Sequence, residues 1–412
     1  MLSCRVGGIV PKKRRLTLAA VRQDGLGGAH RVVRVAYIVH TFEMGGLERC
    51  VARLCNHLDR DRLRPMVVCL SRSGAAADWI ERDDVPIIEL RKRDGNDPLL
   101  VRRLARALNE HRVDIVHSHN WGTLVETSLA RRWARVPVHV HAERGTLMGD
   151  LNGGGLRGRL RAAAARWAMN RADYVVTVAE SVRQKLTARC GRLRTPVQVI
   201  PNGVDAPTVS MSETQLVQRR QTLGIAREAI VLGSVGRLVP VKDFGNAIDA
   251  VSELRRRGHD VHLILVGDGP EHDRLAARAD ERGIADRVRL VGRQEDVGNW
   301  LAMMDIYLNV SLSEGMSQSI LEAMAAGLPM VVTDVGDNAI LVDGEDPCGL
   351  VVPPASSVAI AAAAANLLEG SVHRLKLSRN GRARYARCYT ADAMIQAYQH
   401  LYSELHAASP TQ

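Results

Sequence analysis

The sequence is poor in aromatic residues. Its 412 residues include two phenylalanines, five tryptophans and seven tyrosines, so the core is expected to be largely aliphatic. It also lacks any apolar run near the roughly 18 residues that a membrane-spanning helix needs. The basic run Lys12–Arg15 is followed only by the short apolar stretch Leu16–Val21. That stretch is too short for a secretion signal, so we predict a cytoplasmic protein whose residues 1–33 form a loose basic tail.

Further absences narrow the chemistry. The seven cysteines include no Cys-x-x-Cys pair, and no cysteine–histidine spacing suits zinc, which indicates reduced, buried thiols. The sequence contains no Walker loop and no Gly-x-Ser-x-Gly elbow. No serine–histidine–aspartate or cysteine–histidine arrangement stands out. These absences argue against an NTPase and against a hydrolase.

Positive charge is concentrated in the first half of the chain. Residues 1–205 hold 36 Lys and Arg against 20 Asp and Glu, a net charge of +16, whereas residues 206–412 hold 20 against 25, a net charge of −5. A basic half of this kind suits an anionic membrane surface or a phosphorylated acceptor, or is simply a solvated surface. Nucleic acid is the weaker alternative, because no aromatic residues interleave with the basic ones and no nucleic-acid-binding motif occurs.

Short β-branched runs alternate with longer amphipathic segments, which predicts an α/β protein with doubly wound parallel sheets. The predicted strands before residue 201 are Arg34–His40, Met66–Leu70, Ile87–Leu90, Asp114–His117, Val138–His141, Tyr174–Val178 and Val197–Ile200. Those after it are Ile230–Val235, His262–Val266, Val288–Leu290, Ile306–Val310, Met330–Val332 and Leu350–Val352. The helices expected among them include Leu47–Leu58, Leu99–His111, Leu156–Ala172, Phe244–Arg257, Glu271–Arg282 and Gln318–Ala326.

The break in this alternation at Pro201-Asn202-Gly203 predicts a domain boundary. We expect two Rossmann-like domains, residues 34–200 and 201–390, with a hinge near 201–207. The last segment, 391–412, contains the predicted helix Ala391–His406, which is expected to pack back towards the first domain. Ligands of such folds bind outside the carboxyl ends of the strands, and a cleft between two domains is the default site.

The strongest motif follows the predicted strand Ile306–Val310. Glu314 and Gly315 precede a helix that begins near Ser317, and Glu322 lies inside that helix. Free N–H groups at a helix start bind phosphates or sugar hydroxyls. Two carboxylates that flank this start can accept hydrogen bonds from different hydroxyls of one ligand, and a sugar nucleotide has such hydroxyls on both its sugar and its ribose. A capped surface helix with two solvated acids is the alternative.

A second motif, Gly233-Ser234-Val235-Gly236-Arg237 with Lys242 shortly after it, closes another strand. The glycines allow the backbone to approach a ligand closely. Arg237 and Lys242 place two cations nearby, and such cations stabilise the negative charge that grows on a departing diphosphate. A surface Arg and Lys in a loop is the alternative interpretation.

These motifs resemble those of glycosyltransferase family 4. The match rests on Glu314, seven residues, Glu322, and the following Ala323-Met324-Ala325-Ala326-Gly327-Leu328-Pro329. The resemblance implies the GT-B fold, retention at the anomeric carbon, contact of Glu314 with the donor sugar and of Glu322 with the ribose, and a diphosphate role for Arg237 and Lys242. The wider family more often has Glu-Gly-Phe-Pro at this site. The variant found here, Glu314-Gly315-Met316-Ser317, resembles that of exopolysaccharide and capsule transferases.

The same resemblance extends to the first half of the chain. Gly45-Gly46 opens onto a predicted helix and is not a Gly-x-Gly-x-x-Gly fingerprint, and in the family this glycine pair closes over the donor diphosphate. His119 occupies the family position near the reactive carbon of the donor sugar. His117 is expected to point the opposite way and to be packed. A simple glycine turn is the alternative for Gly45-Gly46. His117 and His119 have the spacing of a metal-binding pair, but no further ligand cluster accompanies them.

Three weaker assignments complete the candidate site. Arg144 is expected either to meet a phosphate on the acceptor or to form a surface pair. Arg293 follows Gly292 where the family holds the base, so we predict that Arg293 contacts it. Asp59 and Asp61 fit an Asp-x-Asp metal pair, but they follow a helix on the side expected to face away from the ligand. We therefore predict catalysis that needs no metal and no cofactor, with Gly315, Met316 and Ser317 contributing to donor binding.

The sequence thus predicts a retaining glycosyltransferase that moves a hexose from a UDP- or GDP-sugar to a hydroxyl of a saccharide or lipid-linked saccharide. The expected setting is exopolysaccharide or cell-surface glycan synthesis at the inner face of the plasma membrane. His119, Arg237, Lys242 and Glu314 are the predicted catalytic residues. Two alternatives remain: a GT-B-fold epimerase that acts on a sugar nucleotide, and a non-catalytic transferase-like scaffold.

Overall fold

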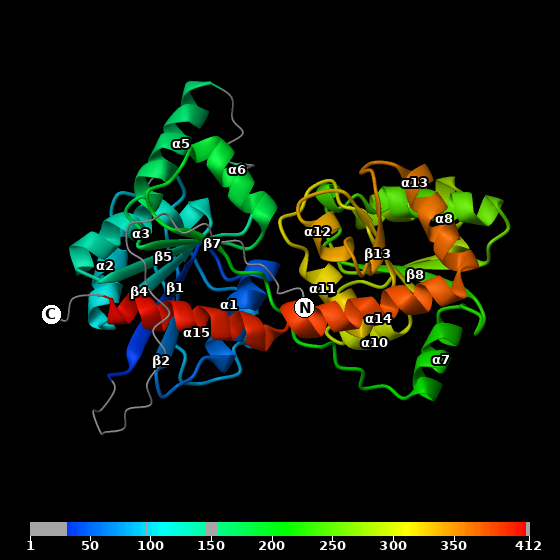
Figure 1. Ribbon diagram of the computed structural model, residues 1–412, viewed down its shortest axis with the longest axis horizontal. Coiled ribbons are helices and arrows are strands. Elements are labelled where there is room, and N and C mark those ends of the chain that lie inside the picture. Colours follow the sequence, from blue (N-terminus) through cyan, green and yellow to red (C-terminus); the bar gives the residue numbers. More distant parts are fainter. Residues whose placement is uncertain (1–30, 96, 146–154, 409–412) are drawn as a thin grey trace. The chain divides into compact units, whose positions relative to one another are not determined.

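The computed structural model describes residues 31–95, 97–145 and 155–408 (Figure 1). Most of the predicted basic tail, up to residue 30, lies outside these residues, and the first strand begins at Val33. The chain divides into two compact units. Unit 1 holds residues up to Ile200 and again from Ile395, and unit 2 is Pro201–Met394. The units are described separately below.

Unit 1 is built on a seven-stranded sheet in which every neighbouring pair is parallel, in the order β3-β2-β1-β4-β5-β6-β7. Its strands are β1 (Val33–Val39), β2 (Leu63–Cys69), β3 (Ile87–Glu89), β4 (Ile115–His119), β5 (Val138–Glu143), β6 (Tyr174–Thr177) and β7 (Val197–Val199). Parallel pairing needs crossover helices, which explains the strand–helix alternation of the sequence.

Helices lie on both faces of this sheet (Figure 1). They are α1 (Gly46–His57), α2 (Leu100–Glu110), α3 (Trp121–Ala134), α5 (Leu156–Met169), α6 (Glu180–Cys190) and the end of α15 (Ala391–Ala407), with a short 3-10 turn at Ala75–Trp79. Because side chains alternate along a strand, Ala36 and Ile38 pack with α2 on one face. Tyr37 lies on the opposite face, where its hydroxyl meets that of Tyr402 from α15.

Unit 2 repeats the architecture with six parallel strands in the order β10-β9-β8-β11-β12-β13. The strands are β8 (Ile230–Val235), β9 (Val261–Val266), β10 (Val288–Leu290), β11 (Ile306–Asn309), β12 (Met330–Thr333) and β13 (Gly349–Val352). Its helices are α7 (Glu213–Thr222), α8 (Phe244–Arg256), α9 (His272–Glu281), α10 (Val297–Ala302), α11 (Gln318–Ala326), α12 (Asn338–Val342), α13 (Ser357–Glu369) and α14 (Ser371–Cys388). Short 3-10 turns lie at Pro240–Lys242 and Ala285–Arg287.

Both faces of the unit 2 sheet are apolar, as expected for a parallel sheet covered by helices on each side. Ile306 and Leu308 belong to the core that packs with α8 and α13, whereas the intervening Tyr307 belongs to the core that packs with α10 and α11. The thirteen predicted strands and the doubly wound α/β class are confirmed, with strand ends that differ from the prediction by at most three residues.

Each sheet has one point where the strand order reverses direction. In unit 1 it lies between β1 and β4, and in unit 2 between β8 and β11. Crossover connections leave such a point on opposite faces of the sheet, so a crevice forms at the carboxyl ends of the two strands. The loops that follow β1, β4, β8 and β11 therefore hold the positions at which a ligand is expected.

Two further expectations concern the core and the membrane. The cysteines of the described residues carry free thiols, and all but the half-buried Cys388 are buried. Burial raises the pKa of the Cys69 thiol to about 12 and that of Cys348 to about 11, so both stay protonated and inert at neutral pH. Within the described residues, no helix combines the length and the hydropathy that crossing a bilayer requires.

Candidate functional site

An ion pair bridges the two loops at the reversal point of unit 2. Lys242 Nζ lies 2.5 Å from Glu314 Oε1, and both side chains are largely shielded from solvent. Lys242 ends the loop after β8, and Glu314 lies in the loop after β11. The hydroxyl of Ser311 donates to the same Oε1 at 2.8 Å. The structure thus brings together two residues that the sequence predicted for different parts of the ligand.

A second set of contacts, from the end of β12 and the loop that follows it, holds the Glu314 loop in place. Gly336 has φ +59°, and a Cβ built on it would lie 2.5 Å from the carbonyl oxygen of Glu314. The backbone N–H of Asp337 donates to the carbonyl of Gly315 at 3.1 Å. The hydroxyl of Thr333 donates to the carbonyl of Ser311 at 2.7 Å. The loop after β12 therefore supports the loop after β11.

Helix α11 presents an uncapped N-terminus directly after this loop. Ser317 is its N-cap residue but makes no side-chain capping hydrogen bond, and its hydroxyl instead contacts Asn309 at 3.2 Å and Ser319 at 3.1 Å. The first N–H groups of the helix are therefore not satisfied by a cap, which suits them to bind an oxygen-rich anion.

The other predicted residues around α11 lie in different surroundings. Glu322 is half-buried near the Tyr307 hydroxyl, and its charge contributes to a Tyr307 pKa that burial mainly raises, to about 12. The Met316 side chain packs against the core, and its sulfur accepts from the backbone N–H of Asn202 at 3.2 Å. The carbonyl of Met316 accepts from the side-chain amide of Asn202 at 3.4 Å, so Asn202 holds this residue from both its main chain and its side chain.

The loop after β8 contains one expected cation and one expectation that needs correction. Arg237 is exposed, and no hydrogen bond or ion pair of its guanidinium occurs within the described residues. Gly233 was expected to admit a ligand to the backbone. Instead, a Cβ there would meet the Met304 side chain at 2.2 Å, so this glycine allows the turn between α10 and β11 to pack on β8. The turn Gly267–Gly269 likewise packs on the backbone of Gly236 and Leu238.

Arg293 lies outside this cluster. It is exposed and follows Gly292, whose carbonyl accepts from the N–H of Gly267 in an isolated bridge. Within the described residues, the Arg293 side chain makes no hydrogen bond or ion pair with Lys242 or Glu314, and its base contact stays a prediction.

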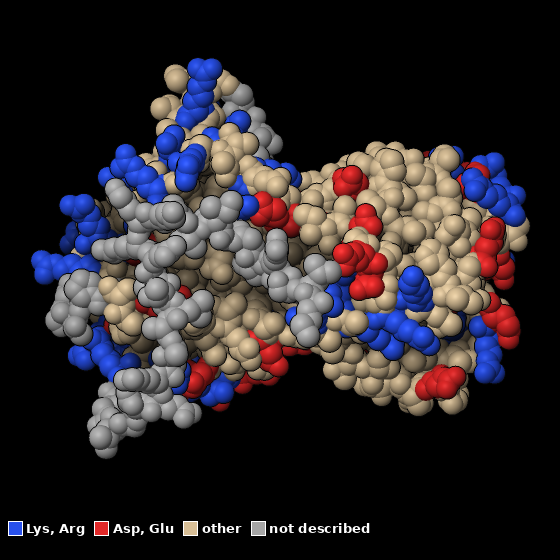
Figure 2. Space-filling view, in the orientation of Figure 1, with Lys and Arg blue, Asp and Glu red and all other residues tan. Residues whose placement is uncertain are grey.

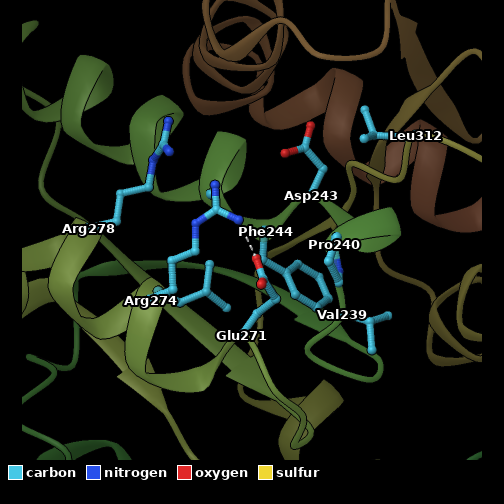
Figure 3. Close-up of a pocket in the computed structure, with 10 residues that line it drawn as sticks. Val239, Pro240, Asp243, Phe244, Glu271, Arg274, Arg278 and Leu312 are labelled. Carbon is cyan, nitrogen blue, oxygen red and sulfur yellow. Dashed lines mark hydrogen bonds and ion pairs between the residues drawn. The ribbon is translucent and has the colours of Figure 1, made fainter.

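A cavity of unit 2 lies beside the loop after β8 (Figure 3). It has a volume of about 240 Å³ and is lined by Val239, Pro240, Asp243, Phe244, Gly245, Glu271, Arg274, Leu275, Arg278 and Leu312. None of the predicted ligand residues lines it. Arg274 is paired with Glu271 at 2.9 Å, and Arg278 is paired with Asp249, so its cations are already neutralised. The Lys242–Glu314 pair and the uncapped start of α11 therefore lie outside this cavity.

In unit 1, strand β4 ends in a buried cluster of polar rings. The rings of His117 and His119 are tilted by 35° with centroids 4.2 Å apart, and the Tyr37 ring lies 5.5 Å and 6.0 Å from them. The expectation that His117 points away from His119 is wrong, because residues two apart on a strand share a face. The hydroxyl of Tyr402 lies 2.6 Å from His117 Nδ1, and this contact packs α15 onto the strand.

The backbone that presents His119 is held rigidly. Its N–H donates to the hydroxyl of Thr123 at 2.9 Å, and that hydroxyl donates to the carbonyl of His119 at 2.8 Å. The next residue, Asn120, has φ +58°, which is unusual for a residue other than glycine. Its side-chain oxygen accepts from the N–H of Arg144 at 3.0 Å. Strained residues of this kind cluster at functional sites.

Arg144 orients the His119 ring. Its Nε donates to His119 Nδ1 over a long contact of 3.5 Å, and its Nη2 reaches the Tyr398 hydroxyl, also at 3.5 Å. If Nδ1 accepts, the proton of the neutral ring lies on Nε2. That buried Nε2 has no hydrogen-bond partner in the described part of the chain. Arg144 therefore contacts His119 from a half-buried position, and its expected contact with an acceptor phosphate stays a prediction.

Burial also sets the charge of this cluster. It lowers the pKa of His117 and of His119 well below 6.5, and it lowers that of His141 to about 3. Neighbouring Arg144 and the other histidines act in the same direction on His117 and His119. His119 is thus a neutral N–H donor at physiological pH and cannot act as a cationic acid.

The glycine pair after β1 forms the start of α1, as predicted. Gly45 is its N-cap residue with extended backbone, and no side chain caps the helix. A Cβ on Gly45 would lie 2.5 Å from a carboxylate oxygen of Glu48. The Glu48 carboxylate thus lies close to the start of α1, and a phosphate that bound there would have to displace it.

No group of three or more His, Cys, Asp and Glu residues suited to a metal ion occurs within residues 31–95, 97–145 and 155–408. Asp59 and Asp61 lie just before β2, at the amino end of the sheet of unit 1, and Asp59 accepts from the N–H of Asp61 at 3.0 Å. His119 follows the carboxyl end of that sheet, so the acidic pair is far from it.

Comparison with known proteins covers most of the chain. The model for Glycosyltransferase Family 4 matches residues 44–206, and the model for Glycosyl transferases group 1 matches residues 229–370. A 2-deoxystreptamine glucosyltransferase of Streptomyces kanamyceticus is 30% identical over 194 residues, which are 46% of this chain and only 50% of that protein. The Escherichia coli UDP-Gal:alpha-D-GlcNAc-diphosphoundecaprenol alpha-1,3-galactosyltransferase is 26% identical over 337 residues, which are 77% of this chain and 83% of that one.

Solved structures agree on the architecture. HepE from Anabaena, crystallised with UDP and glucose, superimposes with a TM-score of 0.78 over 90% of this chain and 99% of its own. Its sequence is 23% identical, so this likeness concerns the fold.

Proposed function

Because the chain belongs to glycosyltransferase family 4 and has the GT-B fold, we propose that it transfers a hexose from a UDP- or GDP-sugar to a hydroxyl acceptor with retention of the anomeric configuration. The observation that supports this most directly is the Lys242–Glu314 pair beside the uncapped start of α11. Cations, a carboxylate and the N–H groups of an uncapped helix start are the functional groups that a sugar diphosphate requires.

We assign the donor as follows. Lys242 Nζ has three N–H donors and Glu314 takes one, which leaves two for phosphate oxygens. Arg237 adds a second cation, and the N–H groups of α11 add neutral donors. Glu314 receives both its hydrogen bonds on Oε1, so Oε2 remains for a hydroxyl of the sugar. By resemblance, Glu322 holds the ribose, and Gly45 and Gly46 close over the diphosphate. The HepE structures with UDP and UDP-glucose support a nucleotide-sugar donor.

The proposed reaction breaks the bond between the anomeric carbon and the diphosphate oxygen. The acceptor oxygen forms the new bond on the same face, and its proton passes to the departing phosphate oxygen. Arg237 and Lys242 stabilise the growing charge of the leaving group. Glu314 and the N–H of His119 orient the sugar. Since two side-chain cations supply this stabilisation, we expect activity to persist in a chelator such as EDTA.

The acceptor that we propose is a saccharide or a lipid-linked saccharide. The E. coli relative acts, by its name, on a diphosphoundecaprenol-linked sugar, and a Bacillus subtilis relative, EpsF, is named as a glycosyltransferase. A setting in exopolysaccharide or surface-glycan synthesis at the inner face of the plasma membrane follows from this acceptor class.

A thermal-shift panel of UDP, GDP and their sugars tests the donor assignment. A ligand at a hundred times its Kd adds about 2.7 kcal/mol to the stability of the folded state, which is readily seen as a rise in Tm. We expect one base to be preferred and the effect to be lost in a variant with both Arg237→Gln and Lys242→Gln. Stabilisation by no nucleotide would contradict the proposal.

The two alternative functions, a sugar-nucleotide epimerase and a non-catalytic scaffold, are tested by nucleotide release and by mutation. An epimerase would convert the donor sugar or release nucleotide without any acceptor, whereas a transferase releases nucleotide in proportion to acceptor. A scaffold would keep its cellular function after Glu314→Ala, and we expect that function to be lost.

A further inference from the structure

We propose that helix α5 of unit 1 is a docking surface for an anionic lipid bilayer. The proposal deepens the proposed function, because a lipid-linked acceptor would bring the enzyme to a membrane, but its physical basis is independent of catalysis. It rests on the way in which apolar and basic side chains divide the surface of one helix.

Two opposite stripes run along α5. Gly158, Ala165 and Met169 are buried and form the face that packs on unit 1, against α3 and α6. Leu156 and Leu160 lie about 200° and 160° around the helix from this face and are 73% and 60% exposed. A helix that packs through small residues and turns its large apolar residues outward has its hydrophobic face in solvent, which is the reverse of an ordinary surface helix.

The exposed apolar residues follow helical spacing. Leu156, Leu160, Ala163 and Trp167 occupy positions i, i+4, i+7 and i+11, and all four are exposed. We call these four residues the α5 stripe. Trp167 is 37% exposed and carries the guanidinium of Arg171 over its ring at 4.2 Å. Tryptophan beside arginine suits the boundary between lipid headgroups and acyl chains.

Arginines flank the α5 stripe on both sides. Arg157 and Arg161 follow its leucines by one position, and Arg159 and Arg166 precede stripe residues by one position, so all four lie within about 100° of the stripe. The helix contains no acidic residue. In Figure 2, arginine and lysine side chains gather over α3 and α5 at the upper end of unit 1. A surface with one sign of charge around an apolar centre fits an anionic bilayer.

Helix α3 extends the surface. Its C-terminal turn exposes Trp133 to 61% and carries Arg132 and Arg135, both exposed. Arg131 donates to the carbonyl of Arg171 at 3.0 Å and so joins the carboxyl ends of α3 and α5. A nucleic acid would use the arginines but leave the leucines in water, so the apolar stripe favours lipid.

Flotation of the full chain with vesicles tests this inference. We compare phosphatidylcholine vesicles with vesicles that also contain phosphatidylglycerol. Each arginine near an anionic surface strengthens binding about fivefold, so Arg157→Gln with Arg161→Gln should weaken binding to the anionic vesicles by about 25-fold at low salt. Leu156→Ser with Leu160→Ser should weaken it at least about tenfold, because these side chains no longer bury apolar area.

A matched control lies on α14 of unit 2. Val372 and Leu375 are 80% and 59% exposed and have Lys376 and Arg379 nearby, so Val372→Ser with Leu375→Ser removes similar groups elsewhere. We expect this variant to bind vesicles as the wild type does. Loss of binding in the α14 variant but not in the α5 variants would overturn the proposal. Equal binding of the wild type to vesicles with and without phosphatidylglycerol would also overturn it. Retention of the wild type on DNA that is lost in the Leu156→Ser, Leu160→Ser variant would do the same.

The nucleotide thermal shift, measured on the same variants, separates the two proposals. An α5 variant that keeps the wild-type shift and Tm but loses vesicle binding supports the docking surface. A wild type that binds anionic vesicles but shows no nucleotide shift would contradict the proposed function and leave the docking surface standing.

Discussion

Glu314 and Lys242 neutralise each other across the reversal point of the unit 2 sheet. A buried pair of this kind contributes little to net stability, because desolvation offsets most of the attraction. The pair instead positions the Glu314 carboxylate. Lys242 and Ser311 hold Oε1, and this fixes the direction in which Oε2 points. The ion pair is thus better understood as part of the binding geometry than as a structural support.

This geometry predicts opposite effects of one substitution on two ligands. Glu314→Gln keeps the size of the side chain but releases Lys242 from its ion pair. We expect binding of the free nucleoside diphosphate to be unchanged or stronger, while kcat/KM falls about 100-fold because the sugar loses a charged acceptor. Titration calorimetry with the nucleotide and steady-state kinetics measure the two effects. An equal loss in both would show that Glu314 serves mainly to hold the loop.

A second prediction concerns the proton on His119. Arg144→Gln removes the guanidinium that contacts Nδ1, so the imidazole should populate both tautomers, and kcat should fall about tenfold as the donor N–H is lost from part of the molecules. Nitrogen-15 NMR of the histidine rings reports the tautomers directly. Nucleotide binding in unit 2 should not change.

Tyr402→Phe is the matched control for this experiment. It removes the hydroxyl from His117 Nδ1 and leaves Arg144 in place. We expect a loss of about 1 kcal/mol in stability but an unchanged His119 tautomer. If both variants alter His119 alike, the ring is set by general packing of the cluster and not by Arg144.

At the scale of elements, the strands were predictable because their β-branched runs are buried on both faces and need no long-range information. The end of β4 was not. His117, Ser118 and His119 are polar and were not all included in the predicted strand, yet they continue it. His117 contacts Tyr402 of α15, and Ser118, on the other face of the sheet, contacts His139 and His141 of β5. Tyr398 and Tyr402 come from a segment more than 250 residues away, which no local pattern connects to this strand.

The residues of the candidate site likewise divide into those that the sequence identifies and those that only the folded chain reveals. Glu314, Lys242 and Arg237 stand in motifs with fixed spacing, so they were identified from the sequence. The supports of Glu314, which are Ser311 and Gly336, carry no chemistry of their own and only the folded backbone reveals them. The close contact of Glu48 with Gly45 also could not be predicted from the sequence, since it depends on the rotamer of the Glu48 side chain at the start of α1.

The loop after β12 gives an element-scale prediction. Gly336→Ala places a Cβ against the carbonyl of Glu314 and also forces alanine to adopt φ +59°. We expect the backbone strain to cost about 1 kcal/mol and the clash to displace the Glu314 loop, with donor-sugar affinity lowered about tenfold or more. Chemical denaturation and binding titrations measure the two quantities.

Gly283→Ala is the control for strain alone. Gly283 has a similar φ of +66°, but a Cβ there would meet nothing within 4 Å. This variant should lose about the same stability from the backbone and keep its affinity for the donor. An equal loss of affinity in both variants would mean that the loop after β12 does not position Glu314.

At the scale of the whole molecule, the two units differ in how they respond to acid. The sheet of unit 1 buries four histidines, His117, His119, His139 and His141, and burial lowers the pKa of each below 6.5. In unit 2, burial lowers the pKa of His262, which Arg287 also disfavours as a cation. The polar cluster that serves the site of unit 1 therefore carries a cost that appears only at low pH.

The sign of this effect follows from proton binding. Above a pH of about 6.5 these histidines are neutral in the folded and in the unfolded chain, so stability does not depend on them. Below it the unfolded chain takes up protons that the folded chain excludes, and the folded state loses up to about 1.4 kcal/mol per pH unit for each such histidine. Unit 1 should therefore lose several kcal/mol between neutral pH and a pH of about 5, whereas unit 2 should lose less.

Hydrogen exchange read by mass spectrometry resolves the two units in one experiment. After correction for the intrinsic pH dependence of exchange, peptides of β4 and β5 should lose protection in acid well before peptides of β8 and β11. His272→Gln, which removes a half-exposed histidine of unit 2, should leave both profiles unchanged. If the strands of both units lost protection together, the acid sensitivity would belong to the chain as a whole, and the buried histidines of unit 1 would not be its cause.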